Sequence, residues 1–508
     1  MYEADTIAKL MERGAAGATA LAAPGRTPLT YGGLREFCAR TAGALNAIGI
    51  GIGDRVAIVL PNGPEMASAF LSVASAATAA PLNPTYRREE FDFYLSDLNA
   101  KALLIHEGLD SPAREVANAR NIPIVEVAID EAKAAGQFAL KPSKPSGAAR
   151  GRSACGADDI ALVLHTSGTT ARPKIVPLSH RNVTASAVNI RNTLRLVPDD
   201  VCLNIMPLFH IHGLIAAVLS SIGAGATVSC TPGFDALKFF RWFVDVNPTW
   251  YTAVPTMHQG ILMRAPRYAD AIAKGRLRLI RSSSASLPPQ VMGEMEKVFG
   301  VPVIEAYGMT EAAHQMASNP LPPAKHYAGS VGVAAGPEIA IMNDGGAILN
   351  ANDIGEVVIR GRDVFDGYEN NPDANAGSFS NGWFRTGDQG YLDDAGYLRL
   401  TGRLKELINR GGEKISPIEV ETVLLDHPQV AQAVAFAAPH AMLGEEVAAA
   451  IVLREHATAT DAELREFVAQ HLAPFKVPRK IVFLSVIPKG PTGKPQRIGL
   501  AKVLGLAS

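Results

Sequence analysis

The sequence predicts an α/β protein with mostly parallel sheets, a β-barrel-like subdomain of short antiparallel strands, and a small α+β unit at the carboxyl end. Three observations predict this architecture. Apolar runs alternate with helical patterns through the first 330 residues. Segments rich in turn residues follow this region. A compact mixture of helical and strand patterns closes the chain after residue 402.

The parallel part rests on short apolar runs that are separated by helical stretches, a pattern typical of parallel sheets with helices on both faces. The expected buried strands are 55–61, 160–166, 226–231, 249–255, 277–284 and 301–308. Two longer uncharged stretches, 66–86 and 211–234, are rich in small residues and broken by Pro or Gly. A membrane span needs ~20 predominantly apolar residues. We therefore expect these stretches to be buried inside the protein and expect no membrane partner.

After about residue 330 the sequence pattern changes to short apolar segments separated by turn residues. Segments 355–361 and 383–402 carry turns such as Asp-Asp-Ala-Gly, which favour antiparallel hairpins. Helices are then expected at 416–426 and 461–472, and strands at 432–439, 446–454 and 480–485. We place the domain boundary between residues 402 and 403, which gives a large domain of residues 1–402 and a small one of residues 403–508.

Composition excludes several classes of protein. Of 508 residues, 47% are hydrophobic and 19% charged, which excludes a disordered chain. The net charge is −1 without long runs of one sign, so we expect no nucleic-acid partner. The four cysteines are far apart, which favours a reducing compartment over a disulfide framework. No signal-peptide pattern is visible at the amino end, so we expect a cytoplasmic protein.

The strongest local signal is the segment 166–174, Thr-Ser-Gly-Thr-Thr-Ala-Arg-Pro-Lys, which follows an apolar strand. Hydroxyl and backbone N–H groups can surround phosphate oxygens, while Lys and Arg neutralise their charge. The segment is not a Walker A loop, and a polar surface turn is the alternative interpretation. The candidate phosphate-binding residues are Thr166, Ser167, Gly168, Thr169, Thr170 and Lys174.

Two further residues allow a functional and a structural interpretation. Tyr307 follows an apolar strand in a turn beside Gly308, where an aromatic face could stack on adenine or pack into the core. Asp388 follows Thr386 and Gly387, so its carboxylate could accept hydrogen bonds from ribose hydroxyls or serve as a turn former.

The segment 166–174 resembles the phosphate loop of the adenylate-forming superfamily, which includes acyl-CoA synthetases, adenylation domains of peptide synthetases and luciferases. Seven further motifs match in order, at 207–210, 282–287, 305–311, 383–388, 402–406, 411–414 and 491–494. The resemblance implies a large AMP-binding domain and a mobile α+β lid, with a hinge at Lys405.

The resemblance also implies individual roles in an ATP site. Tyr307 would be the adenine platform, and Asp388 and Arg403 would hold the ribose. Glu311 would meet Mg²⁺, and Lys494 would bridge the carboxylate and the α-phosphate. The other residues implied at this site are Ser284, Ala285, Ser286, Glu305, Ala306, Gly308 and Thr310.

The implied reaction transfers AMP from ATP to a carboxylate and then passes the acyl group to the thiol of coenzyme A. ATP, Mg²⁺ and CoA are thus the expected cofactors, and Gly412 and Lys414 would lie near the thiol. Because an anion attacks an anionic phosphate, catalysis requires charge neutralisation and positioning. Thr310, Glu311, Lys494 and His210 are the expected catalytic residues.

The expected acyl pocket is polar for a fatty-acid tunnel, since Ser283, His210 and His314 lie in its motifs. A protonated histidine would favour an anion. Segments 165–182 and 305–323 are similar to the oxalyl-CoA synthetases, which implies oxalate as the substrate. A ligase for malonate, a short-chain acid or an aryl acid, a luciferase-like oxygenase and an inactive nucleotide sensor stay open. The surroundings of Lys494 also resemble an acetylation site, which implies a lysine acetyltransferase as a partner.

Overall fold

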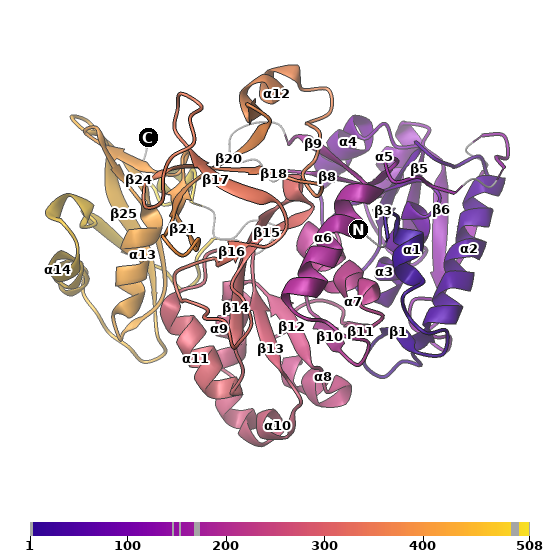
Figure 1. Cartoon of the computed structure of the whole chain (residues 1–508), viewed down its shortest axis with the longest axis horizontal. Helices are drawn as coiled ribbons and strands as arrows, with labels where there is room; N and C mark the ends of the chain where they lie inside the picture. Colours follow the sequence, from indigo (N-terminus) through magenta and orange to yellow (C-terminus); the bar gives the residue numbers. More distant parts are fainter. Residues whose placement is uncertain (1–3, 145–146, 152–153, 167–172, 489–496, 507–508) are drawn as a thin grey trace.

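The computed structural model describes residues 4–144, 147–151, 154–166, 173–488 and 497–506 (Figure 1). It confirms the predicted fold class, because two large and mostly parallel sheets carry helices on their faces and a small mixed sheet forms at the carboxyl end. Among the described residues, no helix is both long enough and apolar enough to cross a membrane.

The first large sheet has seven strands in the order β7-β6-β5-β3-β4-β8-β9. Its strands are β3 (Arg55–Val59), β4 (Thr78–Pro81), β5 (Ala102–His106), β6 (Ile124–Ile129), β7 (Phe138–Pro142), β8 (Ile160–His165) and β9 (Ile175–Ser179). Its helices are α2 (Tyr31–Ala47), α3 (Pro64–Ala74), α4 (Arg88–Asp97) and α5 (Ala113–Ala119). Every residue of α3 and β4 is buried, as predicted for the uncharged stretch 66–86.

The second sheet has nine strands in the order β16-β15-β14-β13-β12-β10-β11-β1-β2. Its strands are β1 (Thr19–Ala22), β2 (Leu29–Thr30), β10 (Val201–Asn204), β11 (Thr227–Cys230), β12 (Trp250–Ala253), β13 (Leu279–Ser282), β14 (Val303–Met309), β15 (His314–Ser318) and β16 (Val333–Ala334). The helices around it are α1 (Ile7–Met11), α6 (His180–Thr193), α7 (Ser220–Gly223), α8 (Phe239–Val246), α9 (Pro255–Leu262), α10 (Ala269–Lys274) and α11 (Pro289–Phe299).

A π-helix, η1 (His212–Leu219), lies inside the second uncharged stretch and is buried along its whole length. π-Helical turns are rare and often mark functional sites. Gly213 allows η1 to begin here, because a Cβ atom at this position would lie 2.4 Å from the Pro207 carbonyl oxygen. The close approach places the segment Pro207–His210 against the start of η1.

Five antiparallel strands form a third sheet, where the sequence predicted hairpins. They are β17 (Glu338–Met342), β18 (Gly355–Arg360), β19 (Phe379–Ser380), β20 (Trp383–Leu392) and β21 (Leu398–Arg403), and α12 (Pro372–Ser378) precedes β19. Buried and half-buried residues alternate along most of β20. The alternation identifies one face of this strand as the side that packs against the protein interior.

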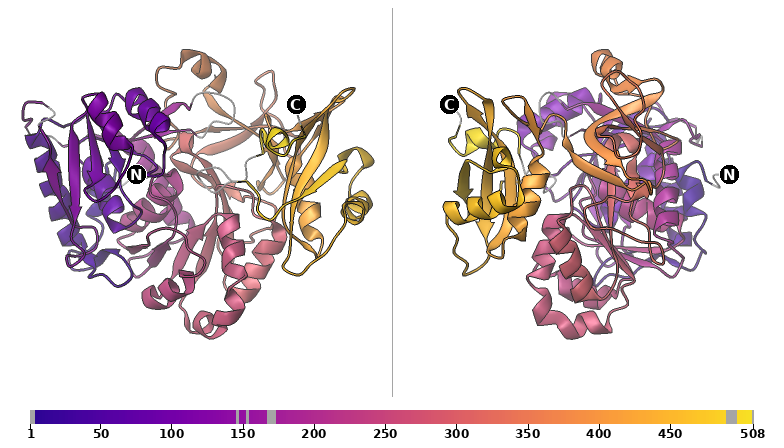
Figure 2. Two further views of the ribbon diagram at one scale, coloured as in Figure 1. Left: turned by 180° about the vertical axis from the view of Figure 1, so that it is seen from behind. Right: turned by 60° about the vertical axis from the view of Figure 1, so that its left-hand side comes forward.

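The lid has a mixed sheet and a hydrophobic core of its own. Its elements are β22 (Ile408–Arg410), β23 (Glu413–Ile415), α13 (Pro417–Asp426), β24 (Val430–His440), β25 (Gly444–Leu453), α14 (Asp461–His471), β26 (Lys480–Phe483) and α15 (Leu500–Val503). The chain changes sheets between Arg403 and Ile408, and the boundary at 402–403 stays a prediction. Figure 2 shows the lid, in yellow, at one side of the large domain beside α9 and α11.

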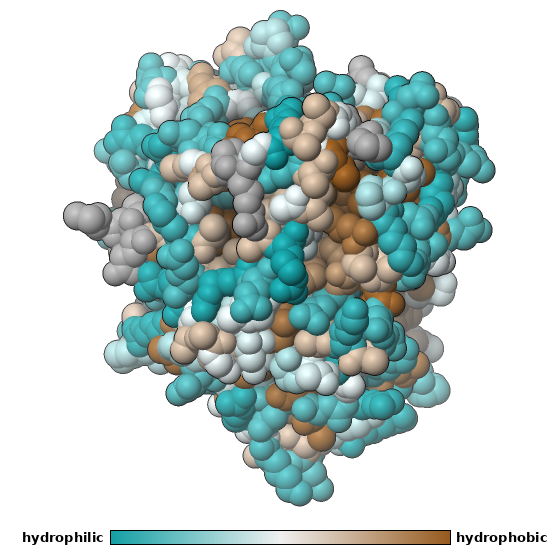
Figure 3. Space-filling model, turned by 90° about the vertical axis from the view of Figure 1, so that its right-hand side faces the viewer, coloured by the Kyte–Doolittle hydropathy of each residue, from teal (hydrophilic) through white to brown (hydrophobic). Residues whose placement is uncertain are grey.

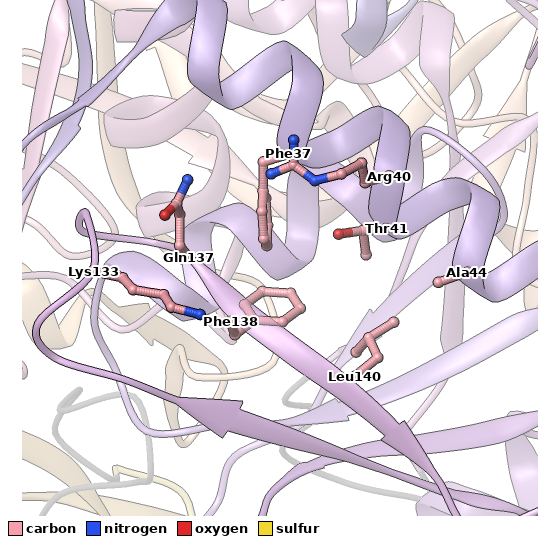
Figure 4. Close-up of a pocket in the computed structure, with 8 residues that line it drawn as sticks. All are labelled: Phe37, Arg40, Thr41, Ala44, Lys133, Gln137, Phe138 and Leu140. Atoms are coloured by element: carbon pink, nitrogen blue, oxygen red, sulfur yellow. The ribbon is translucent and has the colours of Figure 1, made fainter.

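Figure 3 views the molecule from the side that carries α2 and the first sheet. Hydrophilic side chains cover the rim of this face, and hydrophobic ones gather toward its centre. One open hollow of about 300 Å³, drawn in Figure 4, lies between α2 and β7. Its lining residues are Phe37, Arg40, Thr41, Ala44, Lys133, Gln137, Phe138 and Leu140. None of these is a predicted site residue, so this hollow is separate from the expected chemistry.

Candidate active site

Three residues predicted to bind adenosine meet around one carboxylate. The Tyr307 hydroxyl donates a hydrogen bond to Asp388 Oδ2, and Arg403 Nε donates to Asp388 Oδ1 at 2.9 Å. Asp388 on β20 and Arg403 on β21 are cross-strand partners, so the register of this hairpin fixes their contact. Asp388 is 6% exposed, and its negative charge raises the pKa of Arg403. The arrangement can hold a ribose diol beside an aromatic ring.

The turn after β13 carries the predicted purine-lining residues Ser284, Ala285 and Ser286. Ser284 has φ = +74°, a conformation that non-glycine residues rarely adopt outside functional or strained sites. The turn is held by a hydrogen bond of 2.8 Å from the Leu287 N–H to Glu305 Oε1. Burial raises the pKa of Glu305 to about 8, and among the described residues Oε2 has no hydrogen-bond partner. Because Oε1 accepts from Leu287, the proton of the neutral carboxyl lies on Oε2, where it would donate to an acceptor such as an adenine ring nitrogen.

A carboxylate and a cation gather where the sequence predicts phosphate and metal. Glu311 is 6% exposed and accepts a hydrogen bond of 2.7 Å from the Tyr368 hydroxyl. Lys174 Nζ lies 4.1 Å from the centre of the Tyr368 ring. Burial raises the pKa of Glu311 and lowers that of Lys174, to which the charge of Lys405 also contributes. Hard cations such as Mg²⁺ prefer carboxylate and phosphate oxygens, which fits this cluster.

The two ends of the predicted phosphate loop lie together. The Thr166 N–H donates to the Lys174 carbonyl at 2.9 Å, and the Lys174 N–H donates to Thr166 Oγ1 at 3.2 Å. The candidates Ser167, Gly168, Thr169 and Thr170 lie outside the described residues, as does Lys494. Their predicted roles stay predictions.

The candidate acyl residues come from three places in the chain: Ser283 follows β13, His314 begins β15 beside the end of β14, and His210 precedes η1. His314 is 1% exposed, and Gly308 is required beside it, because a Cβ there would lie 1.6 Å from the His314 carbonyl oxygen. His210 Nδ1 accepts a hydrogen bond of 3.3 Å from the His212 N–H. The Ser283 hydroxyl donates to the Ala306 carbonyl at 2.8 Å. Ser283 would have to give up this bond before it could donate to a substrate carboxylate.

Sequence reasoning did not single out three residues at this end of the site, namely His212, Thr252 and Arg281. His212 Nδ1 lies 3.0 Å from Ser284 Oγ, and its Nε2 lies 2.6 Å from Thr252 Oγ1. The His212 and His314 ring centres are 4.9 Å apart. A signal for His212 existed in the His-Ile-His segment at 210–212, and one for Arg281 in the presence of a charge inside an apolar strand.

The predicted hinge and CoA residues belong to the start of the lid. Lys405 is exposed in the turn between β21 and β22. Gly412 and Lys414 are exposed on the hairpin between β22 and β23. Arg497, three residues after Lys494, forms ion pairs with Glu406 and Glu421. These ion pairs join Arg497 to the turn of the predicted hinge and to α13.

Two family models together match most of the chain. The model described as AMP-binding enzyme matches residues 11–369, and that described as AMP-binding enzyme C-terminal domain matches residues 419–494. The chain belongs to the AMP-binding enzyme family.

The AMP-binding enzymes most similar to this chain include two oxalate–CoA ligases. That of Arabidopsis thaliana is 46% identical over 97% of this chain and 98% of its own length. That of Saccharomyces cerevisiae is 42% identical over 90% of this chain and 88% of its own length. The crystal structure of ATP-bound MatB from Rhodopseudomonas palustris has a TM-score of 0.88 at 29% identity, covering 98% of both chains. ATP, Mg²⁺ and CoA are the cofactors of this AMP-binding enzyme, as the sequence predicted.

The described residues fit a Mg²⁺ ion that is bound together with ATP. In the described ranges, no group of three or more His, Cys, Asp or Glu side chains could hold a metal ion. Mg²⁺ in nucleotide enzymes is usually held by one or two carboxylates together with substrate phosphates. Glu311, beside Lys174 at the foot of the phosphate loop, matches that arrangement.

We expect the Tyr368→Phe substitution to raise the Mg²⁺ concentration for half-maximal activity about 10-fold, since a hydrogen bond to a carboxylate is lost while the ring beneath Lys174 remains. Initial rates measured over a series of Mg²⁺ concentrations test this. The matched control is Tyr397→Phe, whose hydroxyl donates to the Lys325 carbonyl on the surface. An identical Mg²⁺ response of the Tyr368→Phe variant and the control would contradict the assignment.

Glu305 is expected to make stability depend on pH. The pKa of Glu305 is raised from 4.5 to about 8 in the folded protein. Between these two values the folded protein binds more protons than the unfolded chain, so the free energy of unfolding falls as the pH rises from about 4.5 to about 8. Glu305→Gln should therefore be more stable than the wild type at pH 8 by about 1–3 kcal/mol, with little difference at pH 5. Urea unfolding from pH 5 to pH 8 measures the effect. Glu455→Gln, at an exposed position, is the control, and parallel pH curves would refute the prediction.

Proposed function

We propose that this enzyme is an acid–thiol ligase that converts oxalate, ATP and CoA into oxalyl-CoA, AMP and pyrophosphate. The observation that carries the proposal is the polar and cationic character of the buried acyl end, where His212, His314 and Arg281 lie together. A small acid with a second carboxylate suits such surroundings, whereas a fatty acid does not. The similarity to two oxalate–CoA ligases along nearly the whole chain supports the same substrate.

In the first step, an oxalate oxygen attacks the α-phosphorus of ATP, and the bond from that phosphorus to the pyrophosphate oxygen breaks. Tyr307 and Asp388 hold the adenosine, while Lys174 and Lys494 offset the negative charge that gathers at the phosphate. Mg²⁺, when bound at Glu311, supplies further positive charge. Charge stabilisation of this kind acts strongly in a site that excludes water.

In the second step, the CoA sulfur attacks the acyl carbon and AMP leaves with the electrons of the broken bond. We assign this step to a second lid orientation that turns about Lys405. In that orientation Lys494 has left the site, and Gly412 and Lys414 approach the thiol. The exposure of both residues on one hairpin leaves them accessible for this contact.

Oxalate-dependent formation of AMP, measured with CoA and ATP against malonate, acetate, a fatty acid and an aryl acid, tests the substrate. Activity on any of these with none on oxalate would overturn the assignment. ATP binding without any acid-dependent exchange of pyrophosphate into ATP would instead favour a nucleotide sensor.

Two narrower proposals concern the cell. The free cysteines, three of them buried, fit a cytoplasmic location, which fractionation of cells would test.

Acetylation of Lys494 by a lysine acetyltransferase would remove the charge that the first step needs. Full activity of a Lys494-acetylated preparation would exclude that form of control.

A further inference from the structure

Arg281 is a charged side chain in the middle of a parallel sheet. It lies on β13 between β12 and β14, is 0% exposed, and is among the largest fully buried side chains of the described protein. The preceding residue, Ile280, packs into a hydrophobic cluster that also contains Phe240 and Met295. Successive side chains of a strand point to opposite faces of the sheet, so Arg281 points to the other face, toward β15. A guanidinium seldom occupies such a position unless something offsets its charge.

The described residues that Arg281 contacts through its side chain are all neutral or basic. Its Nη1 lies 3.4 Å from His314 Nε2 and 3.5 Å from Thr252 Oγ1, and its Nη2 donates to Gln315 Oε1 at 3.2 Å. Nε is buried without a hydrogen-bond partner in the described structure. No carboxylate of the described residues forms an ion pair with this guanidinium. Burial lowers the pKa of Arg281 to about 9, so the side chain still carries its charge at pH 7.

Gln315 holds the guanidinium in a fixed frame. Its Nε2 donates to Thr193 Oγ1 at 3.1 Å and to the Ala335 carbonyl at 2.9 Å. With both amide hydrogens engaged, its oxygen is directed at Arg281. The cation is therefore oriented by neutral groups, and its charge is left to act on the neighbouring histidines.

Arg281 also determines which nitrogen of His314 can carry a proton. A guanidinium has only donors, so the His314 Nε2 atom beside it has to be the acceptor. A neutral imidazole with an accepting Nε2 carries its proton on Nδ1. The Nδ1 atom lies on the side of Gly308, 3.0 Å from where a Cβ at that position would be. His314 thus presents an N–H donor toward the turn that follows Tyr307.

The same cation is connected to the purine-lining turn. Thr252 Oγ1 contacts both Arg281 Nη1 and His212 Nε2, and His212 Nδ1 contacts Ser284 Oγ. Arg281 and His212 are the titratable side chains that the described structure places against His314. The described members of this cluster, Arg281, Thr252, His212 and His314, are cationic or neutral.

We propose that Arg281 is a positioning residue that makes the acyl site select acids with a second carboxylate. It holds His314 as a neutral Nδ1–H donor and supplies the positive charge that offsets the second carboxylate of the substrate. The inference rests on the proposed function and extends it, because it assigns the charge requirement to one side chain that does not belong to any of the motifs of the sequence.

The test compares Arg281→Met and Arg281→Lys with Arg276→Met, which removes the same charge from an exposed position five residues earlier. Arg281→Met should raise the KM for oxalate about 10- to 100-fold and leave the KM for ATP within about 2-fold. Arg281→Lys should fall between this variant and the wild type. Equal changes in both KM values, or an unchanged KM for oxalate, would overturn the proposal.

The pH profile separates this role from a purely structural one. Without Arg281, His314 can take a second proton, so the KM of Arg281→Met for oxalate should recover as the pH falls from 8 to 6. The wild-type KM should stay flat over that range. If the KM of Arg281→Met for oxalate did not change between pH 8 and pH 6, the charge near the substrate would not depend on Arg281 and His314. This result would count against the proposal.

A measurement on the wild type keeps the proposal falsifiable if the variants fail to fold. Nitrogen NMR of histidine-labelled protein, with the His314 signal assigned by its loss in His314→Asn, should give the Nδ1–H tautomer from pH 6 to pH 8. An Nε2–H tautomer or a charged ring would overturn the inference. This result is independent of the substrate, so a wild type without activity on oxalate would refute the proposed function and leave the tautomer question answered separately.

Discussion

Replacing Asp388 with alanine is expected to raise the KM for ATP about 10²- to 10⁴-fold, since two hydrogen bonds from the ribose to a charged group, each contributing about 1.5–3 kcal/mol, are lost. In the described structure, the Tyr307 hydroxyl and Arg403 both donate hydrogen bonds to the carboxylate of Asp388. Its removal takes away the proposed ribose acceptor and releases both partners. Exchange of pyrophosphate into ATP at varied ATP concentration measures the effect.

Asp388→Asn is the milder companion variant, because its amide keeps one oxygen acceptor and loses the charge. It should lie between alanine and the wild type. Glu338→Ala is the matched control, since it breaks an exposed ion pair with Arg360 on the same sheet. The ribose assignment would be wrong if the KM for ATP were the same in Asp388→Ala and in this control.

The Lys494→Ala variant is expected to lose adenylation about 10²- to 10³-fold and to retain thioester formation from a supplied acyl-adenylate. The physical reason is that the positive charge is needed only while one anion attacks another. Arg497 is ion-paired with Glu406 beside the predicted hinge and with Glu421 on α13, so Arg497 belongs to the lid. In the proposed mechanism the lid turns between the two steps, so a charge needed for one step only is needed in one orientation only.

The two half-reactions are measured separately, by pyrophosphate exchange and by release of AMP from the adenylate in the presence of CoA. Lys502→Ala is the control, because Lys502 is an exposed residue of α15 in the same carboxyl-terminal segment. Equal loss of both half-reactions in Lys494→Ala would argue against a role confined to adenylation.

Local sequence was sufficient for the parallel sheets. Apolar runs such as 55–61 and 160–166 became β3 and β8, because a strand buried on both faces reads as a continuous apolar segment. The strand predicted at 226–231 is confirmed as β11, but residues 211–225 before it fold into η1 and α7, and local sequence did not determine whether they form a helix or a strand. A fully buried helix and a fully buried strand have the same apolar composition, so periodicity could not separate them.

Local sequence also identified only some of the residues of the candidate site. The sequence pointed to His210 and His314, but the described contacts place His212 between Ser284 and Thr252. Which histidine of the pair at 210 and 212 turns inward depends on where η1 begins, and this depends on the close approach at Gly213. Neither fact can be read from the order of the residues alone.

By itself, the sequence determined the family, the cofactors and the candidate nucleotide residues, because phosphate and adenosine are met by short contiguous motifs whose residue types carry the chemistry. Only the tertiary structure decided which side chains surround the proposed acyl site. Arg281, Thr252, His212 and His314 come from four separate elements, and packing alone buries the guanidinium away from any described carboxylate. The absence of an anionic partner among the described residues is a property of three-dimensional packing, since no local sequence pattern shows which side chains will lie beside Arg281.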